Sequence, residues 1–448
     1  MIRVRVAPSP TGFLHVGTAQ SSLYNWLFAR KNDGEFLLRI EDTDRERSTK
    51  EAEENIIEGL NWLGLKWDSD VTHSSDNQVR YSELLEKLLK EDKAFYCHHT
   101  KEELEAERKQ QEANKEAPRH ICEHKQKPGN REQGTGIIRL AVDENSDRII
   151  TFEDQIRGKV EFRQSLLGDF SIARAIGDAL YHFAVVVDDV DMNITHVLRG
   201  EDHISNTPKQ ILIYEALEKE VPKFAHLPLL LAPDRSKLSK RHGVTSISDY
   251  KKDYLPEAIV NFLGVLGYTF SKEIISKEEM VQEFELSKVH KSGAIFDIQK
   301  LNWINSQYIK KLSAQEFKNI IGKPDLPDEA VLLMTDRLEK LSDIEQFNYF
   351  WQEPEYDKNL LKWKKASLEE SISALGRVAE VLEKEEFEAD NLRRILDEMG
   401  TEIKDRGLVY WPVRVALTGR EKSPDPVDVA MVLGEEKALE RIRRAIGL

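Results

Sequence analysis

The segment "PSPTGFLHVGT" near the start of the chain holds residues suited to binding an anion. Pro8 and Pro10 stiffen it, because proline fixes its φ angle. Gly17 permits close approach of the backbone to a ligand and falls where a helix is predicted to begin. The free N–H groups of a helix N-terminus attract anions, and His15 adds a donor there. The segment predicts a phosphate site; the plainer alternative is a turn with a core histidine.

A second segment, "DRSKLSKRHG" at residues 234–243, places Lys237 and Lys240 on either side of Ser239. Lysines are mobile point charges that can clamp a polyphosphate. Such charges stabilise the negative charge that develops when a phosphorus centre is attacked. By itself the segment is better explained as a solvated basic loop, because short basic runs are common on surfaces. The segment follows the α/β half of the chain and would face the loop that contains His15 at the other end of that half. This position favours the phosphate clamp.

Buried strands are predicted to position both segments. Val4 and Val6 alternate with Arg3 and Arg5, which is the period of a half-buried strand. "GEFLLRIEDTDRE" predicts a second strand, and an acidic helix over about 48–63 follows it. The apolar runs "YHFAVVVDDV" and "ITHVLRGEDH" predict two further strands of a parallel sheet. Ligands bind at the carboxyl ends of strands in such sheets.

The composition places limits on function. The 448 residues carry a formal net charge of −15, which gives no support to non-specific nucleic-acid binding. Two cysteines indicate a reducing compartment rather than a disulfide framework. No run is long enough for a membrane span, and no apolar signal segment begins the chain. We therefore expect a cytoplasmic protein with no membrane partner.

The pattern changes twice along the chain. Residues 78–117 are predicted to be helical and highly charged, and 118–180 are less regular with short β-like runs such as "GIIRLAV" and "GKVEFRQ". These segments interrupt the α/β pattern and indicate an insertion. From about residue 245 the pattern is almost entirely helical.

The two signature segments together resemble the ATP-holding elements of class I aminoacyl-tRNA synthetases. "FLLRIEDTD", "GLNWLGLKWD", "ITHVLRGEDHISNTPKQILIYEAL" and "FAHLPLLL" are similar to the glutamyl branch, as are "LPEAIVNFLGVLGY" and "WPVRVALTG" later on. Over most of its length the chain is identified as a member of the bacterial-type glutamyl-tRNA synthetases. Thr18, Leu238 and Arg241 depart from the class consensus, in ways this branch tolerates. "GDALYHF" lacks the Pro-Thr pair that often precedes the tyrosine of the branch.

The resemblance implies a division of labour among site residues. His15, Gly17, Lys237 and Lys240 would be the catalytic set. The ATP site would comprise His15, Gly17, Thr18, Asp202, Leu229, Leu230, Lys237, Ser239 and Lys240. The glutamate pocket would comprise Arg5, Ser9, Glu41, Tyr181 and Arg199. The residue pattern agrees, because Arg5, Glu41 and Arg199 belong to strands whose carboxyl edge should carry the site; structural ion pairing at that edge is the alternative.

The resemblance also implies the domain plan and the reaction. A Rossmann-type doubly wound parallel sheet (1–76 and 186–238) would form the catalytic domain, and an α+β insertion (77–185) would hold the tRNA acceptor end. All-α tRNA-binding regions would follow, contacting the stem (239–312) and the anticodon (313–448). The enzyme would ligate L-glutamate to tRNA(Glu) through an adenylate, using ATP and Mg²⁺, as a monomer.

This interpretation has four alternatives, and the predicted helical pattern of residues 313–448 and the presence of His15, Lys240 and the pocket arginines argue against the first three. A glutamyl-queuosine-type paralogue would lack an anticodon region, and a glutaminyl-tRNA synthetase would have β-barrels there. A non-catalytic tRNA-binding paralogue would have lost His15, Lys240 or the pocket arginines. A non-discriminating enzyme would also charge tRNA(Gln). Tyr410, Trp411 and Arg414 suit anticodon recognition, and a packed helical core explains these aromatics equally well.

One further cluster lies in the predicted insertion. Cys97 and His99, then Cys122 and His124, form two close pairs of soft or borderline ligands. Such a set suits tetrahedral Zn²⁺. Members of this family that hold zinc here often show Cys-x-Cys followed by Cys-x-His, so His99 is a departure that still supplies a ligand, and many members have lost the metal. The alternative is two reduced thiols in a small core with surface histidines.

Overall fold

The computed structural model describes residues 1–44, 46–126, 136–239, 241 and 245–447. Two compact units divide the chain. The first is Met1–Lys251 with Pro256–Leu301, and the second is Lys252–Leu255 with Asn302–Leu448. Lys240 and His242 of the predicted phosphate clamp lie outside the described residues.

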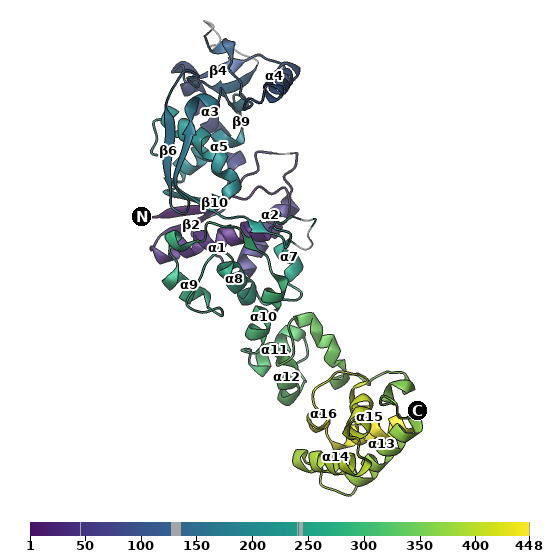
Figure 1. Cartoon of the computed structure of the whole chain (residues 1–448). Coiled ribbons are helices and arrows are strands. Elements are labelled where there is room, and N and C mark those ends of the chain that lie inside the picture. Colours follow the sequence, from purple (N-terminus) through teal and green to yellow (C-terminus); the bar gives the residue numbers. More distant parts are fainter. Residues whose placement is uncertain (45, 127–135, 240, 242–244, 448) are drawn as a thin grey trace. The chain divides into compact units, whose positions relative to one another are not determined.

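Two groups of mostly parallel strands form the centre of the first unit (Figure 1). β1 (Arg3–Val6), β2 (Glu35–Ile40) and β3 (Thr72–His73) pair in parallel. β10 (His196–Gly200) and β11 (Lys223–Leu227) also pair in parallel, and β11 continues to β6 (Ile149–Asp154) and its antiparallel partner β7 (Gly158–Arg163). The N–H of Thr195 donates to the carbonyl of Arg3 at 3.0 Å, which joins β10 to β1. The predicted parallel sheet is confirmed.

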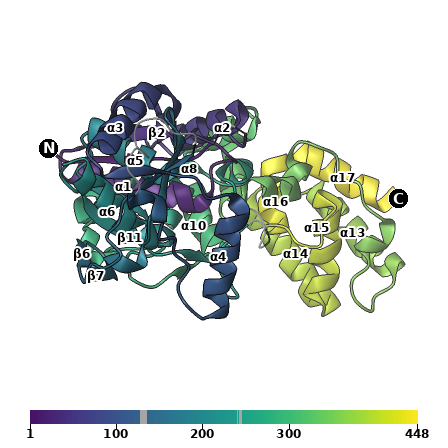
Figure 2. The ribbon, with the colours of Figure 1, turned by 90° about the horizontal axis from the view of Figure 1, so that it is seen from above.

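Helices cover this sheet (Figures 1 and 2). α1 (Val16–Lys31) packs against β1, β2 and β10. α2 (Lys50–Trp62) fulfils the prediction of an acidic helix over about 48–63, and Thr49 caps it by accepting from the N–H of Ala52. α6 (Thr207–Ala216) begins with proline at its second position, where the missing N–H costs nothing.

The prediction that "YHFAVVVDDV" forms a strand is wrong. It forms the helix α5 (Tyr181–Asp191), which is buried from Phe183 to Asp189. A short apolar run that is buried on every side has no amphipathic period, so its sequence does not separate strand from helix. The companion prediction for "ITHVLRGEDH" is confirmed, because its centre is β10.

The inserted segment contains an antiparallel sheet. β4 (Ala94–Cys97), β5 (Ile137–Leu140), β8 (Ser171–Ala175) and β9 (Asp178–Ala179) pair in that order. The prediction that 78–117 is helical throughout is wrong at β4, which separates α3 (Gln78–Lys90) from α4 (Lys101–Ala113). The aromatic-rich "AFYC" of β4 is a typical strand sequence that the charged flanks obscured.

The remaining elements are almost all helical, as predicted. The first unit continues with β12 (Leu230–Leu231), α7 (Ile247–Tyr250), α8 (Pro256–Val265), α9 (Lys277–Glu283) and β13 (Ala294–Ile295). α10 (Ile298–Ile309) begins at its end. The second unit contains α11 (Ala314–Ile321), α12 (Asp328–Thr335), α13 (Leu368–Leu382), α14 (Ala389–Ile403), α15 (Arg406–Thr418), α16 (Pro426–Leu433) and α17 (Glu435–Gly447). None of the described helices has the length and apolar character needed to cross a bilayer.

Candidate active site

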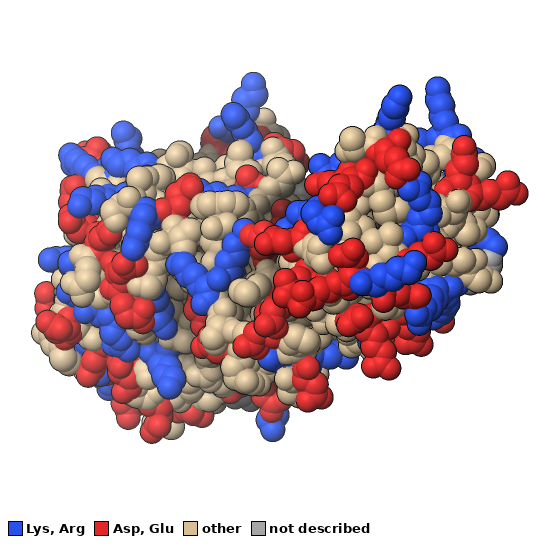
Figure 3. All heavy atoms as spheres, turned by 90° about the horizontal axis from the view of Figure 1, so that it is seen from below, with Lys and Arg blue, Asp and Glu red and all other residues tan. Residues whose placement is uncertain are grey.

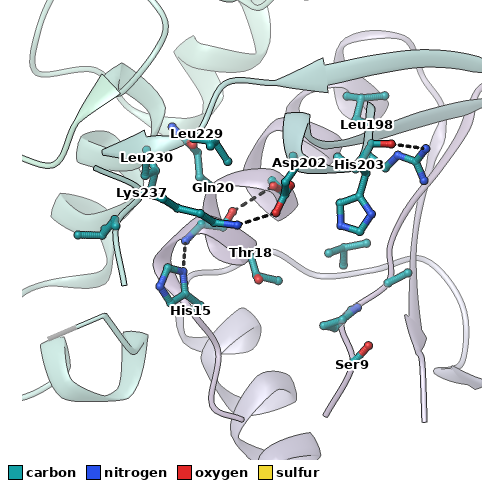
Figure 4. Close-up of a pocket in the computed structure, with 18 of the residues that line it drawn as sticks. Ser9, His15, Thr18, Gln20, Leu198, Asp202, His203, Leu229, Leu230 and Lys237 are labelled. Carbon is teal, nitrogen blue, oxygen red and sulfur yellow. Dashed lines mark hydrogen bonds and ion pairs between the residues drawn. The ribbon is translucent and has the colours of Figure 1, made fainter. Parts of the chain in front are cut away.

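A cavity of about 590 Å³ opens at the carboxyl ends of β1 and β10 in the first unit. Its lining includes every residue that we predicted for ATP or glutamate and that the structure describes. These residues are Arg5, Ser9, His15, Gly17, Thr18, Glu41, Tyr181, Arg199, Asp202, Leu229, Leu230, Lys237 and Ser239. The two signature segments, more than 200 residues apart in the sequence, therefore face one cavity (Figure 4).

His15 caps the helix that begins beside the cavity. It adopts an extended backbone conformation, and its Nδ1 accepts the N–H of Gly17 at 3.0 Å. The neutral ring therefore carries its proton on Nε2. The loop is tied to the chain that follows the lysine segment: Val16 N–H donates to Thr245 O, and Ile247 N–H donates to Leu14 O, both at 2.9 Å. These bonds hold the two signature segments in register.

Lys237 reaches across the opening from the other segment. Its Nζ lies 2.7 Å from Oδ2 of Asp202, and Figure 4 shows the two side chains pointing toward each other. Burial raises the pKa of Asp202, but the hydrogen bond from Lys237 and the charges of His203 and Lys237 together outweigh burial and leave that pKa below its usual value. The N–H of Leu238 donates to Leu230 O, so this segment lies along β12. The pair is partly exposed and therefore able to reorganise around a polyanion.

At the opposite end of the cavity, Arg5 and Glu41 belong to a buried network of charged side chains. Arg5 donates from Nε and Nη2 to the two carboxylate oxygens of Asp189, at 2.9 and 3.1 Å. Arg39 donates to Asp189 Oδ1 at 2.7 Å and to Glu41 Oε1 at 3.1 Å. Although burial opposes it, the two arginines keep the pKa of Asp189 below its usual value. Burial raises the pKa of Glu41 despite Arg39 and Arg5.

Arg199 differs from Arg5 in having no acidic partner. Among the described residues, it forms no ion pair. Its Nη2 donates to Thr207 Oγ1 at 2.8 Å, its Nε donates to Nε2 of His226 at 3.2 Å, and its side chain is largely buried. Burial lowers the pKa of Arg199, but guanidinium stays charged in proteins. The cavity wall thus holds a positive charge that forms no ion pair with any described residue.

Tyr181 and His203 complete this end of the cavity. The hydroxyl of Tyr181 lies 3.1 Å from Nδ1 of His203. Burial raises the pKa of Tyr181 to about 12, and burial with the nearby Arg199 lowers the pKa of His203 to about 4. Both side chains are therefore neutral near pH 7. At the ATP end of the cavity, the N–H of Leu229 donates to Glu201 Oε1 at 3.0 Å. This bond fixes the backbone directly before β12.

Sequence reasoning missed Arg39, Asp189 and His203. Two signals were present. Arg39 interrupts the apolar run "FLLRI", and Asp189 follows the apolar run "FAVVV". A charge inside an apolar run is rarely buried unless it is paired. The sequence therefore required partners for these residues, but it did not say which ones.

A group of possible metal ligands lies in the inserted segment. Cys97, His99, His120 and Cys122 each offer one ligand atom, and these atoms all lie within 4.8 Å of one another. The group differs from the predicted set in one member, since His120 stands in place of His124. Nε2 of His120 faces Cys97 Sγ at 3.7 Å, while its Nδ1 lies 2.6 Å from Glu107 Oε2.

His124 is nearby but arranged differently. Its Nδ1 lies 3.5 Å from Cys122 Sγ and also accepts the backbone N–H of His98 at 3.3 Å. A ring nitrogen that accepts a hydrogen bond has no lone pair left for a metal. A carboxylate behind a histidine, as Glu107 stands behind His120, is the usual support of a metal-bound imidazole. The described residues therefore fit Zn²⁺ through two thiolates and two imidazoles.

The aromatic residues considered for anticodon recognition have internal partners in the second unit. Trp411 Nε1 donates to Leu360 O at 2.8 Å, and its ring lies against Trp363. Tyr410 donates to Asp397 at 2.7 Å, and Arg414 donates to Ser423 O at 2.8 Å. All three side chains are half-buried. These contacts favour the packed-core alternative for Trp411 and Tyr410.

Comparisons with known proteins agree along the whole chain. Residues 1–303 match the family of class I tRNA synthetases (E and Q), catalytic domain, and residues 279–446 match an anticodon binding domain. "Glutamate–tRNA ligase 2" of Thermoanaerobacter pseudethanolicus is 41% identical, with 99% of this chain and 98% of the relative covered. The "Glutamate–tRNA ligase" of Francisella tularensis subsp. novicida is 39% identical, with 100% and 99% covered.

A solved structure gives the same result. The glutamate tRNA ligase from Elizabethkingia meningosepticum, crystallised in complex with its amino acid, superposes with a TM-score of 0.87 at 32% identity. The match covers 100% of this chain and 99% of that one.

Proposed function

Because the chain belongs to the glutamate–tRNA ligase family of class I tRNA synthetases, we propose that it ligates L-glutamate to the 3′-terminal adenosine of tRNA(Glu). One observation supports this most: a single cavity brings a helix N-terminus and Lys237 together with Arg199, which forms no ion pair among the described residues. Such a cavity can hold a triphosphate at one end and an acidic amino acid at the other.

In the proposed reaction, the glutamate α-carboxylate attacks the α-phosphate of ATP, giving glutamyl-adenylate and pyrophosphate. The 2′-hydroxyl of the terminal adenosine then attacks the activated carbonyl and releases AMP. No side chain acts as a covalent nucleophile, so the protein contributes positioning and electrostatic stabilisation. Mg²⁺ accompanies ATP and neutralises part of its phosphate charge.

Each end of the cavity has its own residues in this proposal. His15, Gly17 and Thr18 bind the phosphates at the start of α1, and Lys237 with Lys240 closes over them. Asp202, Leu229, Leu230 and Ser239 line the nucleoside side. Arg5, Ser9, Glu41, Tyr181 and Arg199 form the glutamate pocket, and His203 belongs there as well.

Charge separates glutamate from glutamine in this pocket. The two amino acids are nearly isosteric, but a guanidinium has donors and no acceptor. A glutamine amide would turn its own donors toward Arg199 and leave buried groups unpaired, at about 1–3 kcal/mol each. Sites built on polar matching of this kind discriminate by about 10⁴ or more.

Pyrophosphate exchange with each amino acid, with and without tRNA, tests the proposal. We expect exchange with glutamate, none detectable with glutamine, and a requirement for tRNA(Glu), as the family resemblance implies. Comparable exchange with glutamine would contradict the pocket assignment, whereas exchange without tRNA would contradict only the coupling. Aminoacylation of purified tRNA(Gln) tests the non-discriminating alternative.

Recognition of tRNA is proposed to follow the domain plan expected from the sequence. Residues 77–185 would bind the acceptor end, 239–312 the stem and 313–448 the anticodon, in a cytoplasmic monomer. Figure 3 shows one face of the molecule, on which acidic and basic side chains are interspersed. On that face, contact with tRNA would then depend on local groups rather than on one extended positive field.

We also propose that Cys97, His99, His120 and Cys122 hold one structural Zn²⁺. Metal analysis of protein purified without chelator should give about one equivalent, as a four-ligand structural site requires. His120→Ala should lower the zinc content and the melting temperature, whereas His124→Ala should change the zinc content little. Less than a tenth of an equivalent in the parent protein would contradict the site, by the same stoichiometry.

A further inference from the structure

His226 and Asp154 form a fully buried pair behind the glutamate pocket. Nδ1 of His226 lies 2.6 Å from Asp154 Oδ2, and both side chains are 0% exposed. His226 is on β11 directly opposite Arg199 of β10, and Asp154 ends β6. Neither side chain lines the cavity, so the roles proposed above leave the pair unexplained.

The hydrogen bonds fix which nitrogen of His226 carries the proton. Arg199 is a donor only, so its Nε–H donates to His226 Nε2 and that nitrogen must accept. The proton therefore lies on Nδ1 and is donated to Asp154. Thr207 Oγ1 lies 2.8 Å from Arg199 Nη2 and 3.1 Å from His226 Nε2, which closes the group around the guanidinium.

Asp154 is itself held firmly. Its Oδ1 accepts the backbone N–H groups of Ile156 and Arg157, at 3.0 and 2.8 Å. The backbone N–H of His226 also donates to its Oδ2, at 3.1 Å. The carboxylate is thus fixed by the β6–β7 turn and by β11 at once, so its direction toward the imidazole is set by the backbone.

We infer that Asp154 and His226 are positioning residues that aim Arg199 at the substrate carboxylate without neutralising it. This inference rests on the proposed role of Arg199 in glutamate binding. Arg5 shows the alternative construction: Asp189 orients it directly and also cancels its charge. At Arg199 a neutral imidazole stands between guanidinium and carboxylate, so the arginine is oriented by an acceptor and its charge remains available.

The inference predicts that the polarity of the imidazole matters more than its volume. In Asp154→Asn, Oδ1 can still accept the backbone N–H groups, but an amide N–H₂ replaces Oδ2 opposite His226. The ring would then accept at Nδ1 and carry its proton on Nε2, where it would face the Nε–H of Arg199. Two donors cannot bond, so the guanidinium would leave its position.

The experiment compares steady-state KM values for glutamate and ATP in aminoacylation of tRNA(Glu). Asp154→Asn should raise the KM for glutamate by roughly ten- to hundred-fold, the effect of losing one hydrogen bond to a charged group. The KM for ATP should change less than about two-fold, because Lys237 and His15 are untouched. Glu153→Gln is the matched control: the same change one residue away on the exposed face of β6, and it should have no effect.

A second pair of variants is independent of Asp154. His226→Gln keeps an acceptor toward Arg199 and a donor toward Asp154, whereas His226→Met fills a similar volume with neither. The KM for glutamate should stay near its parent value in His226→Gln and rise in His226→Met. If Asp154→Asn does not fold, this pair decides the question.

Arg199→Lys separates this inference from the proposed function. If Arg199→Lys leaves the KM for glutamate unchanged, the pocket assignment fails and the positioning role fails with it. If Arg199→Lys raises that KM but the Asp154 and His226 variants do not, only the positioning role is overturned. Equal increases in the KM values for glutamate and ATP would also overturn it, because they would indicate general disruption.

Discussion

At the glutamate end of the cavity, charged side chains are buried and locked to one another, whereas at the ATP end they are exposed. Arg5 and Asp189 are each 4% exposed and form a two-pronged pair. Lys237 and Asp202 are 60% and 43% exposed and share a single contact. Arg5, Lys237 and Asp202 line the same cavity, so the contrast arises from what each end must bind.

The difference follows from the chemistry of recognition. Telling a carboxylate from an amide requires donors that cannot adapt, and burial within a fixed network removes that freedom. A triphosphate needs strong charge but little shape selection, and flexible lysines supply it as point charges. The residues that select glutamate should therefore form a rigid network whose disruption lowers folding stability. The residues that bind phosphate should contribute little to folding stability.

Removing the carboxylate that links the buried arginines should have the largest effect. Asp189→Asn leaves Arg5 and Arg39 without their shared anion, so we expect about 3–5 kcal/mol lower stability, as when one partner of a buried pair is removed. Asp202→Asn at the exposed end should cost at most about 1 kcal/mol. Urea unfolding of both variants measures the difference; similar losses would contradict the contrast.

Lys237→Ala should show the reverse pattern, with a large loss of activity and little loss of stability. Removing one preorganised charge stabiliser typically lowers the rate by about 10²–10³. ATP–pyrophosphate exchange with tRNA present measures this rate. Lys219→Ala, an exposed lysine outside the cavity, is the matched control. Normal exchange in Lys237→Ala would remove this lysine from the phosphate clamp.

As the pH falls, the stabilising contribution of groups near the glutamate end should be lost before that of Asp202 at the ATP end. Burial lowers the pKa of His182 and His203 to about 4, so in the folded state both bind protons less readily than in the unfolded chain. Their contribution is fully present above pH 6.5 and is lost as the pH falls toward 4, by up to about 1.4 kcal/mol per pH unit for each. The pKa of Asp202 lies below its usual 3.8, so its contribution is lost only in stronger acid.

Urea titrations between pH 7 and 4.5 test this order. The free energy of unfolding should fall more steeply with decreasing pH in the parent protein than in His203→Gln, because the variant lacks one of the two groups. Parallel slopes would show that His203 does not take up a proton on unfolding.

The smallest effect is expected at Gly200. A Cβ there would lie 2.6 Å from Oδ1 of Asp202, so Gly200→Ala should displace that carboxylate from Lys237. Because an exposed pair is worth at most about 1 kcal/mol, we expect a roughly two- to five-fold rise in the KM for ATP. Gly376→Ala, where a Cβ meets nothing within 4 Å, should leave this KM unchanged.

Local patterns, together with the family resemblance that they carry, were enough to predict much of this protein. Three short stretches carry this chemistry: the loop from Pro8 to Thr18, the strand that contains Arg199 and the lysine segment after Pro233. In each of them, residue type and spacing indicate the backbone conformation directly. These stretches predicted the parallel sheet, and the family resemblance that they carry implied all the described cavity residues assigned above to ATP or glutamate, apart from His203. The pattern from about residue 245 onward predicted the helical second half.

Only the tertiary structure decided which distant groups meet. It made "YHFAVVVDDV" a helix, paired Arg5 with Asp189 and Arg199 with His226, and placed His120 rather than His124 in the metal group. A buried run looks the same as helix or strand, and a buried charge requires a partner without specifying it. Those choices depend on packing between segments 20 to 200 residues apart, which no local period records.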